Sequence, residues 1–458
     1  MIARELAEWA TGEISAPEPV RAAAARHLLD GLGTALAAVR TGAATPALTV
    51  ARGLGGPAES TILGTAERLG ASAAALANGT LVHALDFDDT HAGGLVHATA
   101  VVLPAALAVG EERGASGAAV LTAAVAGYET ACRVAAAAPH GFHARGLHAT
   151  MVAGVFSSAV VAARLMGLDA ARTADALGIA GSQAGGLLAF LGTGASTKQL
   201  HPGFASQAGI IAARLAAAGA TGPETVFDGP HGVYDALAAG TTDPGSIVAG
   251  LGQRWETGGI GIKPWPACQL SHATMAAVLD AMSRHGFGAG QVAAVHAVVH
   301  PDSASVVCDT SRDLTRPASP YAAKFSLPWC VGAVLADGRV GIDTFAESSL
   351  ARPEVAALAA RVTWDVAGAP GVHAADAPGD VRITLTDGRT VTGHVDRSPG
   401  GGSAPLTQDA LVTKLETNVG RPAPELVRAV TELDSAPDLT HLIRGCAAAV
   451  AAHTEHGD

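Results

Sequence analysis

Acidic residues and histidines gather in one short segment of a chain that is otherwise poor in charge. Charged residues make up 15% of the chain, yet positions 83–97 hold three aspartates and three histidines: Asp86, Asp88, Asp89, His83, His91 and His97. Carboxylates and imidazoles are the side chains that most often move protons near neutral pH. The segment follows a helical pattern and runs into Gly93-Gly94, and loops held by rigid elements often carry catalytic groups. We therefore predict catalytic roles for Asp86 and His97; the alternative is that the aspartates solvate a helix end or cap the next helix.

A second group of histidines lies at positions 140–148, again between two apolar helical stretches. It contains His140, His143 and His148, with Arg145 among them. His148 is expected at a helix N-terminus, where the dipole lowers the pKa of an imidazole and keeps it neutral. A neutral imidazole can act as a base near pH 7, so we predict a catalytic role for His148. The alternative is that these histidines are structural.

A lysine follows a stretch rich in glycine and hydroxyl groups, Gly192-Thr-Gly-Ala-Ser-Thr-Lys198-Gln-Leu-His201. The order differs from a phosphate-binding P-loop, because no glycine directly precedes the lysine. One cation and exposed backbone N–H groups before a helix N-terminus suit a carboxylate or a phosphate. We predict that Lys198 holds an anionic substrate; the alternative is a glycine-rich connection with a solvent-facing lysine.

Two later segments add cations and imidazoles from another part of the chain. Lys263 and His272 open a helical stretch, and Tyr321 precedes an apolar helix. Solvated loops are the alternative for both segments. With the earlier groups they predict a small-molecule site in a cleft between domains, where such sites are often found. No H-E-x-x-H or CxxC spacing occurs, so we expect neither a metal nor another cofactor.

The elements that must position these groups are mostly helices. Apolar residues recur with helical spacing through the first 250 residues, which predicts helices over 71–85, 98–113, 116–138, 149–167, 169–184 and 201–219. After Trp255 the pattern changes to β-like runs at 292–300, 361–366 and 381–395. The last run contains Asp387-Gly388, which is typical of a hairpin turn. Helical stretches at 270–285 and 320–336 lie among these strands.

This order of elements predicts a mainly α fold with an inserted α+β domain. A large helical domain takes residues 1–253, and a smaller α+β lid domain takes 254–403. Residues 404–458 are expected to be C-terminal helices that return to the helical domain. The inserted part has an ordinary domain size.

The overall composition excludes several classes of protein. The formal net charge of −12 argues against a nucleic-acid partner, which would call for a basic surface. The long uncharged run 176–197 contains six glycines and several hydroxyl groups, so no membrane segment is expected. Five isolated cysteines and no signal-peptide pattern indicate a cytoplasmic protein.

Several blocks of the sequence resemble the MmgE/PrpD family, which includes 2-methylcitrate dehydratase, cis-aconitate decarboxylase and iminodisuccinate epimerase. They are His83-Ala-Leu-Asp-Phe-Asp-Asp-Thr-His, Val96-His-Ala-Thr-Ala-Val-Val-Leu-Pro, Gly146-Leu-His-Ala-Thr, Ser196-Thr-Lys-Gln-Leu-His-Pro-Gly, Ile262-Lys-Pro-Trp-Pro-Ala-Cys and Ser271-His-Ala. The resemblance implies a helical domain with an α+β lid, a homodimer and no iron–sulfur cluster. By matching position it implies active-site roles for Asp86, Thr90, His97, His148, Lys198, His272 and Tyr321.

The expected activity follows from the resemblance and from the charge chemistry of the candidate residues. We predict a cofactor-independent lyase that moves a proton next to a carboxylate of a small di- or tricarboxylic acid, as a 2-methylcitrate dehydratase-like hydro-lyase does. Asp86, His97, His148, Lys198 and His272 are the catalytic candidates, and Thr90, Lys263 and Tyr321 the substrate-binding ones. An epimerase of a dicarboxylate such as iminodisuccinate, or a cis-aconitate-type decarboxylase, is the alternative. Gln199 stands where the family often has a second basic residue, which favours a dicarboxylate.

Two readings from other classes stay open on sequence grounds. Asp86-Phe-Asp88-Asp-Thr90 matches the DxDxT loop of haloacid-dehalogenase-type phosphatases, which requires a buried strand before Asp86 and bound magnesium. The other reading is a non-catalytic relative that binds a metabolite.

Overall fold

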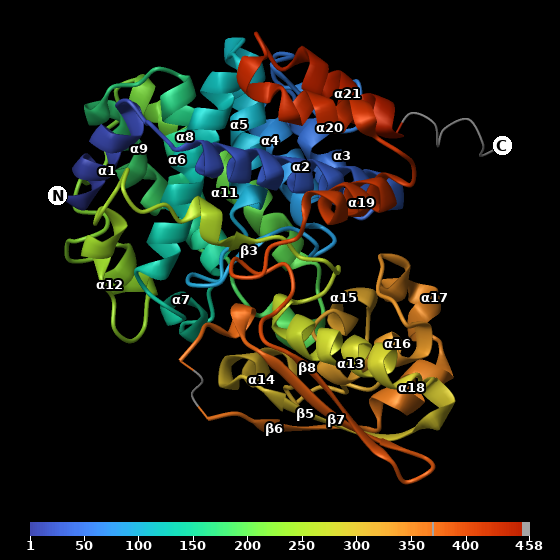
Figure 1. The fold of residues 1–458 in the computed structure, drawn as a ribbon. Helices are drawn as coiled ribbons and strands as arrows, with labels where there is room; N and C mark the ends of the chain where they lie inside the picture. The colour runs from blue at the N-terminus through green and yellow to red at the C-terminus, as the bar shows by residue number, and fades with distance from the viewer. Residues whose placement is uncertain (369–370, 451–458) are drawn as a thin grey trace. The chain divides into compact units, whose positions relative to one another are not determined.

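The computed structural model describes residues 1–368 and 371–450 (Figure 1). The chain forms two compact units. Unit 1 contains residues 1–188, residues 197–260 and the C-terminal stretch from Thr407, and unit 2 contains residues 189–196 and 261–406. The last eight residues of the predicted C-terminal segment, 451–458, lie outside the described residues.

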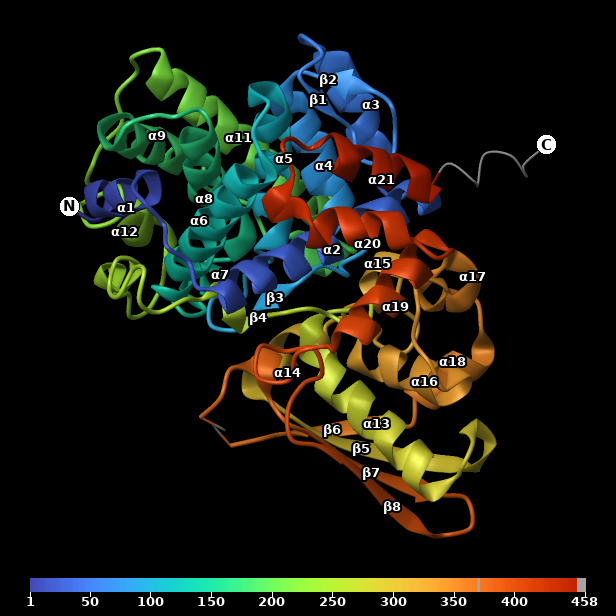
Figure 2. The same cartoon turned by 45° about the horizontal axis from the view of Figure 1, so that its top comes forward.

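Unit 1 is built almost entirely of helices (Figures 1 and 2). They are α1 (Ile2–Thr11), α2 (Glu18–Thr41), α3 (Thr45–Leu54), α4 (Ala71–His83), α5 (Thr99–Arg113), α6 (Gly117–Ala136), α7 (Gly141–Ala144), α8 (Ala149–Leu165), α9 (Ala170–Gly181), α11 (Thr197–Ala217), α12 (Val233–Leu237), α19 (Gln408–Val419), α20 (Pro424–Thr431) and α21 (Thr440–Val450). A small hairpin of β1 (Ser60–Thr61) and β2 (Arg68–Leu69) joins α3 to α4. Among the described residues, no helix combines the length and apolarity needed to span a membrane.

The central helices α4, α5, α8 and α11 approach one another closely because their contact faces carry alanine and glycine. A Cβ on Gly203 of α11 would lie 2.4 Å from the backbone oxygen of Leu76 in α4. A Cβ on Gly209 would lie 2.5 Å from the Cβ of Ser158 in α8. Contacts this short exclude any larger residue at either position. The glycines therefore set the spacing between the helices that carry the candidate site residues.

Unit 2 is a mixed four-stranded sheet covered by helices. The strand order is β6 (Val362–Val366), β5 (Val292–Val299), β7 (Gly379–Leu385) and β8 (Thr390–Val395). β5 pairs parallel with β6 and antiparallel with β7, and Gly388 takes a positive φ of 86° in the predicted β7–β8 turn. Helix α13 (His272–His285) packs on β7 and β8 (Figure 2), and α16 (Leu327–Asp337) contributes Trp329 to the core.

The predicted fold class is confirmed, because helices make up 57% of the structure and unit 2 contains one small mixed sheet. One helix start differs from the prediction. Helix α11 begins at Thr197 rather than at residue 201, so Lys198 lies in its first turn and not in a preceding loop. The shift turns Lys198 and His201 onto one helix face, because residues three apart are neighbours on a helix.

Candidate active site

The loop between α4 and α5 carries the aspartate and histidine segment, and its backbone is unusual. Asp86 takes a positive φ of 52°, which non-glycine residues rarely adopt. The Asp89 carboxylate accepts hydrogen bonds from the Thr99 backbone N–H at 3.0 Å and its Oγ1 at 2.5 Å. Asp89 therefore holds the first turn of α5. This is the alternative stated above, in which an aspartate caps the next helix. Farther along the loop, His91 Nδ1 accepts a hydrogen bond from the Gly94 N–H at 3.2 Å.

His83 and Asp88 form a buried pair at the end of α4. The Nδ1–H of His83 donates to both carboxylate oxygens of Asp88, at 2.8 and 3.0 Å. Both side chains are fully buried. Burial lowers the pKa of His83, and the Asp88 charge opposes that shift. The pair fixes the imidazole orientation, with Nδ1 as the protonated nitrogen.

His97 lies beside this pair and is held by the loop itself. Its Nδ1 donates to the Asp89 backbone oxygen at 2.8 Å, with Thr90 Oγ1 at 3.3 Å. Its backbone N–H donates to Thr150 Oγ1 of α8 at 3.1 Å. The ring centroids of His83 and His97 are 4.6 Å apart. The loop therefore brings two imidazoles into contact at a tilt of 56°, with the Thr90 hydroxyl next to one of them.

His148 is the N-cap of α8, as predicted, and it pairs with a histidine of α11. Its Nδ1 lies 3.1 Å from the Nδ1 of His201, so one ring donates and the other accepts. Burial, and then the Lys198 charge, hold the pKa of His148 well below its usual range. Burial and neighbouring charges lower the pKa of His201 to about 4. The centroid of His148 is 5.7 Å from that of His83 and 5.8 Å from that of His97.

Lys198 places a cation against this histidine cluster. Its Nζ lies 2.5 Å from Asp86 Oδ1, and both side chains are buried. The next residue, Gln199, donates from Nε2 to the Ala84 backbone oxygen at 2.8 Å. Gln199 thus braces the same loop without adding charge. We name the group formed by His83, Asp86, Asp88, His97, His148, Lys198 and His201 the histidine cluster.

The structure brings together five of the eight predicted site residues: Asp86, Thr90, His97, His148 and Lys198 all lie in unit 1. The other three lie in unit 2. Lys263 is fully buried, and His272 Nε2 donates to the Ala267 backbone oxygen at 3.2 Å. Tyr321 is buried, with its ring 5.6 Å from Phe325. Their roles in substrate handling stay predictions.

The sequence prediction missed four residues that the structure places in or next to the site. His83, Asp88 and His201 belong to the histidine cluster. His83 and Asp88 were recognised as part of the acidic and histidine segment but received no catalytic role, and His201 stood only in the quoted Lys198 motif. Lys414 lies in no motif that the sequence analysis singled out. Its Nζ, carried by helix α19, donates to the Phe87 backbone oxygen at 2.9 Å and lies 2.6 Å from Asp30 Oδ1.

The rarity of lysine is the signal that points to Lys414. The chain has only four lysines among its 29 basic residues, and all four are buried.

Two sets of side chains in the cluster have a spacing suited to a metal ion. Their ligand atoms lie within 4.8 Å of one another: His83, His97 and His148 form one set, and His83, Asp86 and Asp88 the other. In the second set Asp86 is already paired with Lys198. The phosphatase alternative loses its structural requirement, because the segment before Asp86 is helix α4 and not a strand.

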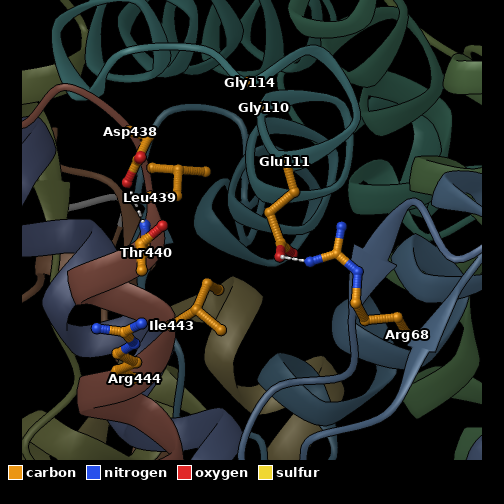
Figure 3. Close-up of a pocket in the computed structure, with 9 residues that line it drawn as sticks. All are labelled: Arg68, Gly110, Glu111, Gly114, Asp438, Leu439, Thr440, Ile443 and Arg444. Atoms are coloured by element: carbon orange, nitrogen blue, oxygen red, sulfur yellow. Dashed lines mark hydrogen bonds and ion pairs between the residues drawn. The ribbon is translucent and has the colours of Figure 1, made fainter.

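A hollow of about 340 Å³ lies elsewhere in unit 1, between the β1–β2 hairpin and helix α21 (Figure 3). In Figure 3 Glu111 and Arg68 point toward each other across it, 3.2 Å apart. The Glu111 carboxylate also accepts hydrogen bonds from Ser60 and Thr61 of the hairpin. This carboxylate therefore anchors the hairpin, and the hollow has none of the proton-transfer groups of the histidine cluster.

Comparison with known families agrees with this layout. The family model described as the MmgE/PrpD N-terminal domain matches residues 4–244, and the model of the MmgE/PrpD C-terminal domain matches residues 265–435. The chain belongs to the MmgE/PrpD family. Its relatives include a protein named cis-aconitate decarboxylase from Aspergillus terreus (strain NIH 2624 / FGSC A1156). It is 28% identical over 477 residues, which cover 96% of this chain and 95% of that protein.

Relatives from animals have the same name. The cis-aconitate decarboxylase of Homo sapiens is 28% identical over 442 residues, covering 92% of this chain and 89% of that protein. The cis-aconitate decarboxylase of Mus musculus is 28% identical over 461 residues, with 92% and 88% covered. The similarity therefore extends over both units of the chain.

Proposed function

We propose that this member of the MmgE/PrpD family is a lyase that acts on a small di- or tricarboxylic acid, using its own side chains to move a proton next to a carboxylate. The observation that carries the proposal is the histidine cluster of unit 1. It combines buried imidazoles with a buried Lys198–Asp86 pair 2.5 Å apart, and the Thr90 hydroxyl lies beside it. Full-length similarity to cis-aconitate decarboxylases supports decarboxylation as the first reaction to test.

Lys198 is proposed to bind a substrate carboxylate. Its charge is compensated by Asp86 in the free protein, so a substrate carboxylate shares the ammonium with Asp86. The neighbouring imidazoles favour the neutral form when the site holds no anion, because they are buried beside Lys198. A bound carboxylate favours the protonated form instead. Substrate binding thus favours uptake of a proton from solvent by an imidazole of the cluster, and the reaction uses that proton.

Decarboxylation of cis-aconitate shows how these groups can work. The carboxylate that leaves is attached to a CH₂ group next to the carbon–carbon double bond. When the bond between the CH₂ carbon and this carboxylate breaks, CO₂ departs and its electron pair forms a new double bond. The original double bond shifts its electrons to the far alkene carbon, and a proton must be added there. His97 and His148 are the two proposed proton donors. The Asp88 contact orients the neighbouring His83 ring, and the His201 contact orients the His148 ring.

The same groups suit dehydration of a 2-methylcitrate-type substrate, the hydro-lyase reaction that the sequence favoured. One imidazole would remove the proton next to a carboxylate and another would protonate the leaving hydroxyl. Lys198 would stabilise the negative charge that develops on the carboxylate oxygens. The outcome depends on where the leaving group lies relative to the acid and the base.

Epimerisation of a dicarboxylate is the second candidate function, and Gln199 is the observation that favours it. Its amide is engaged by the Ala84 carbonyl and adds no positive charge. Lys198 is then the only lysine of unit 1 in the histidine cluster, since Lys414 is paired with Asp30 behind the loop. A substrate with fewer carboxylates needs fewer cations.

Proton NMR of the purified protein in D₂O tests these reactions together. The panel contains cis-aconitate, 2-methylcitrate, citrate, iminodisuccinate and simple hydroxy diacids. Loss of a carboxylate with one deuterium added at carbon supports decarboxylation, and a new alkene with deuterium exchange supports dehydration. Deuterium uptake with inversion and no alkene supports epimerisation. A panel without exchange or turnover contradicts the proposal and favours a binding protein instead.

The assembly and the compartment are also proposals. We propose a cytoplasmic homodimer, as the family resemblance and the five free cysteines suggest. Light scattering coupled to size-exclusion chromatography tests the assembly: a mass of one chain of 45.3 kDa would contradict it, and twice that mass would support it.

A further inference from the structure

Three histidines of the cluster have the arrangement of a transition-metal site. We propose that His83, His97 and His148 bind one divalent transition-metal ion such as Zn²⁺, and that the bound ion inhibits the reaction rather than taking part in it. Binding of the ion is independent of the function proposed above, whereas inhibition by the ion rests on it.

The first argument is the donor set. Nitrogens of the three rings lie within 4.8 Å of one another, and all three side chains are buried. Zinc binds imidazole nitrogen at about 2.0–2.1 Å, which places tetrahedral ligand pairs about 3.4 Å apart. The nitrogens therefore need to move inward by about 1 Å. Three imidazoles suit zinc, copper or nickel and not magnesium or calcium, which prefer oxygen.

The second argument is an unsatisfied nitrogen. Within the described part of the chain, Nε2 of His83 is buried and has no hydrogen-bond partner. A buried polar atom without a partner is costly and needs an explanation. Its Nδ1–H is committed to Asp88, so the lone pair of His83 lies on Nε2. A metal ion in the cluster would satisfy that lone pair.

The third argument is the shell behind the rings. Ligand histidines commonly donate their second N–H to a carboxylate or a backbone carbonyl. His83 does so to Asp88, and His97 donates to the Asp89 backbone oxygen at 2.8 Å. His148 Nδ1 lies 3.1 Å from the Nδ1 of His201, so this ring is held by an imidazole instead. Both oxygens of Asp88 are engaged by His83, and Asp88 Oδ2 lies 3.8 Å from His97 Nδ1, so its charge stands behind two of the rings.

The three-histidine set is favoured over the set of His83, Asp86 and Asp88. Asp86 lies 2.5 Å from Lys198, and an ion bound to Asp86 would have to displace that ammonium. In the three-histidine set the Lys198–Asp86 pair stays intact and is neutral as a whole. The ion would take the place of the proton that His97 or His148 handles, so zinc and substrate are expected to compete.

Metal binding is measured directly on the full chain after treatment with a chelator and dialysis. Zn²⁺ is titrated against a chromogenic competitor, and Co²⁺ is used as a visible probe of the ligand field. One tight Zn²⁺ per chain and the intense bands of four- or five-coordinate Co²⁺ are expected. The wild-type Co²⁺ spectrum needs no variant, so a weak six-coordinate spectrum, or no uptake, overturns the proposal even if variants fold poorly.

Three variants then locate the ion. His83→Gln and His148→Gln are expected to abolish tight binding. Asp88→Asn, which removes no ligand, should weaken affinity by about 10–100-fold. The control is His394→Gln, because His394 lies exposed between Asp380 and Asp396 at 2.7 and 3.0 Å and is the obvious surface competitor. Tight binding lost in the control, or kept in His83→Gln, contradicts the assignment.

Inhibition is tested separately with whichever substrate the NMR panel identifies. Zinc should raise the apparent KM and leave kcat unchanged at saturating substrate. If tight binding is found but no substrate is turned over, the metal site stands and the proposed function fails. If turnover is found and the wild-type chain takes up no metal, the reverse holds.

Discussion

Replacement of Lys414 by methionine tests how the candidate active-site loop is held. Lys414 Nζ lies 2.6 Å from Asp30 Oδ1, donates to the Phe87 backbone oxygen at 2.9 Å and lies 4.0 Å from the centre of the Phe87 ring. Asp30 is fully buried, and burial raises its pKa to about 6 even with the lysine present. Methionine keeps most of the length of the side chain and removes its charge. The variant therefore leaves a buried carboxylate without its cation.

The expected cost can be worked out from this geometry. Breaking a buried ion pair from one side costs about 3–5 kcal/mol, and we expect that loss in the free energy of unfolding at about pH 8. The folded-state pKa of Asp30 is raised above its unfolded value, so the folded state binds the proton more tightly. Stability therefore falls as pH rises through the folded pKa, and without Lys414 the fall extends to higher pH. At about pH 5.5 Asp30 is protonated, and the cost should shrink toward the ~1 kcal/mol of a lost hydrogen bond.

Urea unfolding at both pH values measures the effect. The double variant Lys414→Met/Asp30→Asn removes the titrating group and should lose the extra pH dependence. Arg52→Met is the matched surface control, because Arg52 pairs with Glu67 at 2.7 Å in an exposed position, and it should cost at most about 1 kcal/mol. If the Lys414→Met cost equals that of Arg52→Met, or does not change with pH, then Lys414 does not hold the loop through Asp30.

Three further predictions address the cluster and its scaffold. Lys198→Met should lower turnover by about 10²–10³-fold and destabilise the fold by leaving Asp86 unpaired; steady-state kinetics and melting curves check both, and unchanged turnover would remove the anchoring role. His148→Gln should cost about 10²–10⁴-fold in turnover, whereas His143→Gln should stay within a few-fold. A loss of only a few-fold in His148→Gln would remove its role in proton transfer. Gly203→Ala forces a Cβ to within 2.4 Å of the α4 backbone, so it should destabilise by about 1–3 kcal/mol in urea unfolding; a neutral result would mean that the helices can separate at no cost.

Local patterns accounted for the elements, and the helix that opens at His148 is an example. The apolar periodicity of 149–167 predicted α8, and a histidine directly before such a run lies at the N-cap. The Asp387-Gly388 turn predicted the β7–β8 hairpin for the same reason, because the positive φ at Gly388 is a local requirement. Where the determinant spans three or four residues, the sequence contains it. The start of α11 was missed because Ser196-Thr-Lys reads as equally compatible with a loop and with a first turn.

The pairings inside the cluster could not be read in this way. His148 and His201 are 53 positions apart, and their contact exists only because glycines let α11 pack closely on its neighbours. Asp89 caps a helix ten residues farther on, beyond the short spacing of an ordinary capping box. His83 and Asp88 are near in sequence, but their pairing depends on the positive φ of Asp86. The residue types around Asp86 do not predict that backbone conformation. Tertiary packing and backbone strain decided these contacts.

Lysine usage gives a sequence signal that would have reached farther. The ammonium of lysine is a compact point charge, whereas the planar guanidinium of arginine suits bidentate pairs. In this chain arginine supplies most of the cations, and each of the four lysines is buried: Lys198, Lys263, Lys324 and Lys414. The Phe87 carbonyl that Lys414 contacts lies 327 positions away, so no periodicity or motif joins them. The rarity of lysine is the sequence signal instead, because most basic residues of this chain are arginine and each of the few lysines is buried.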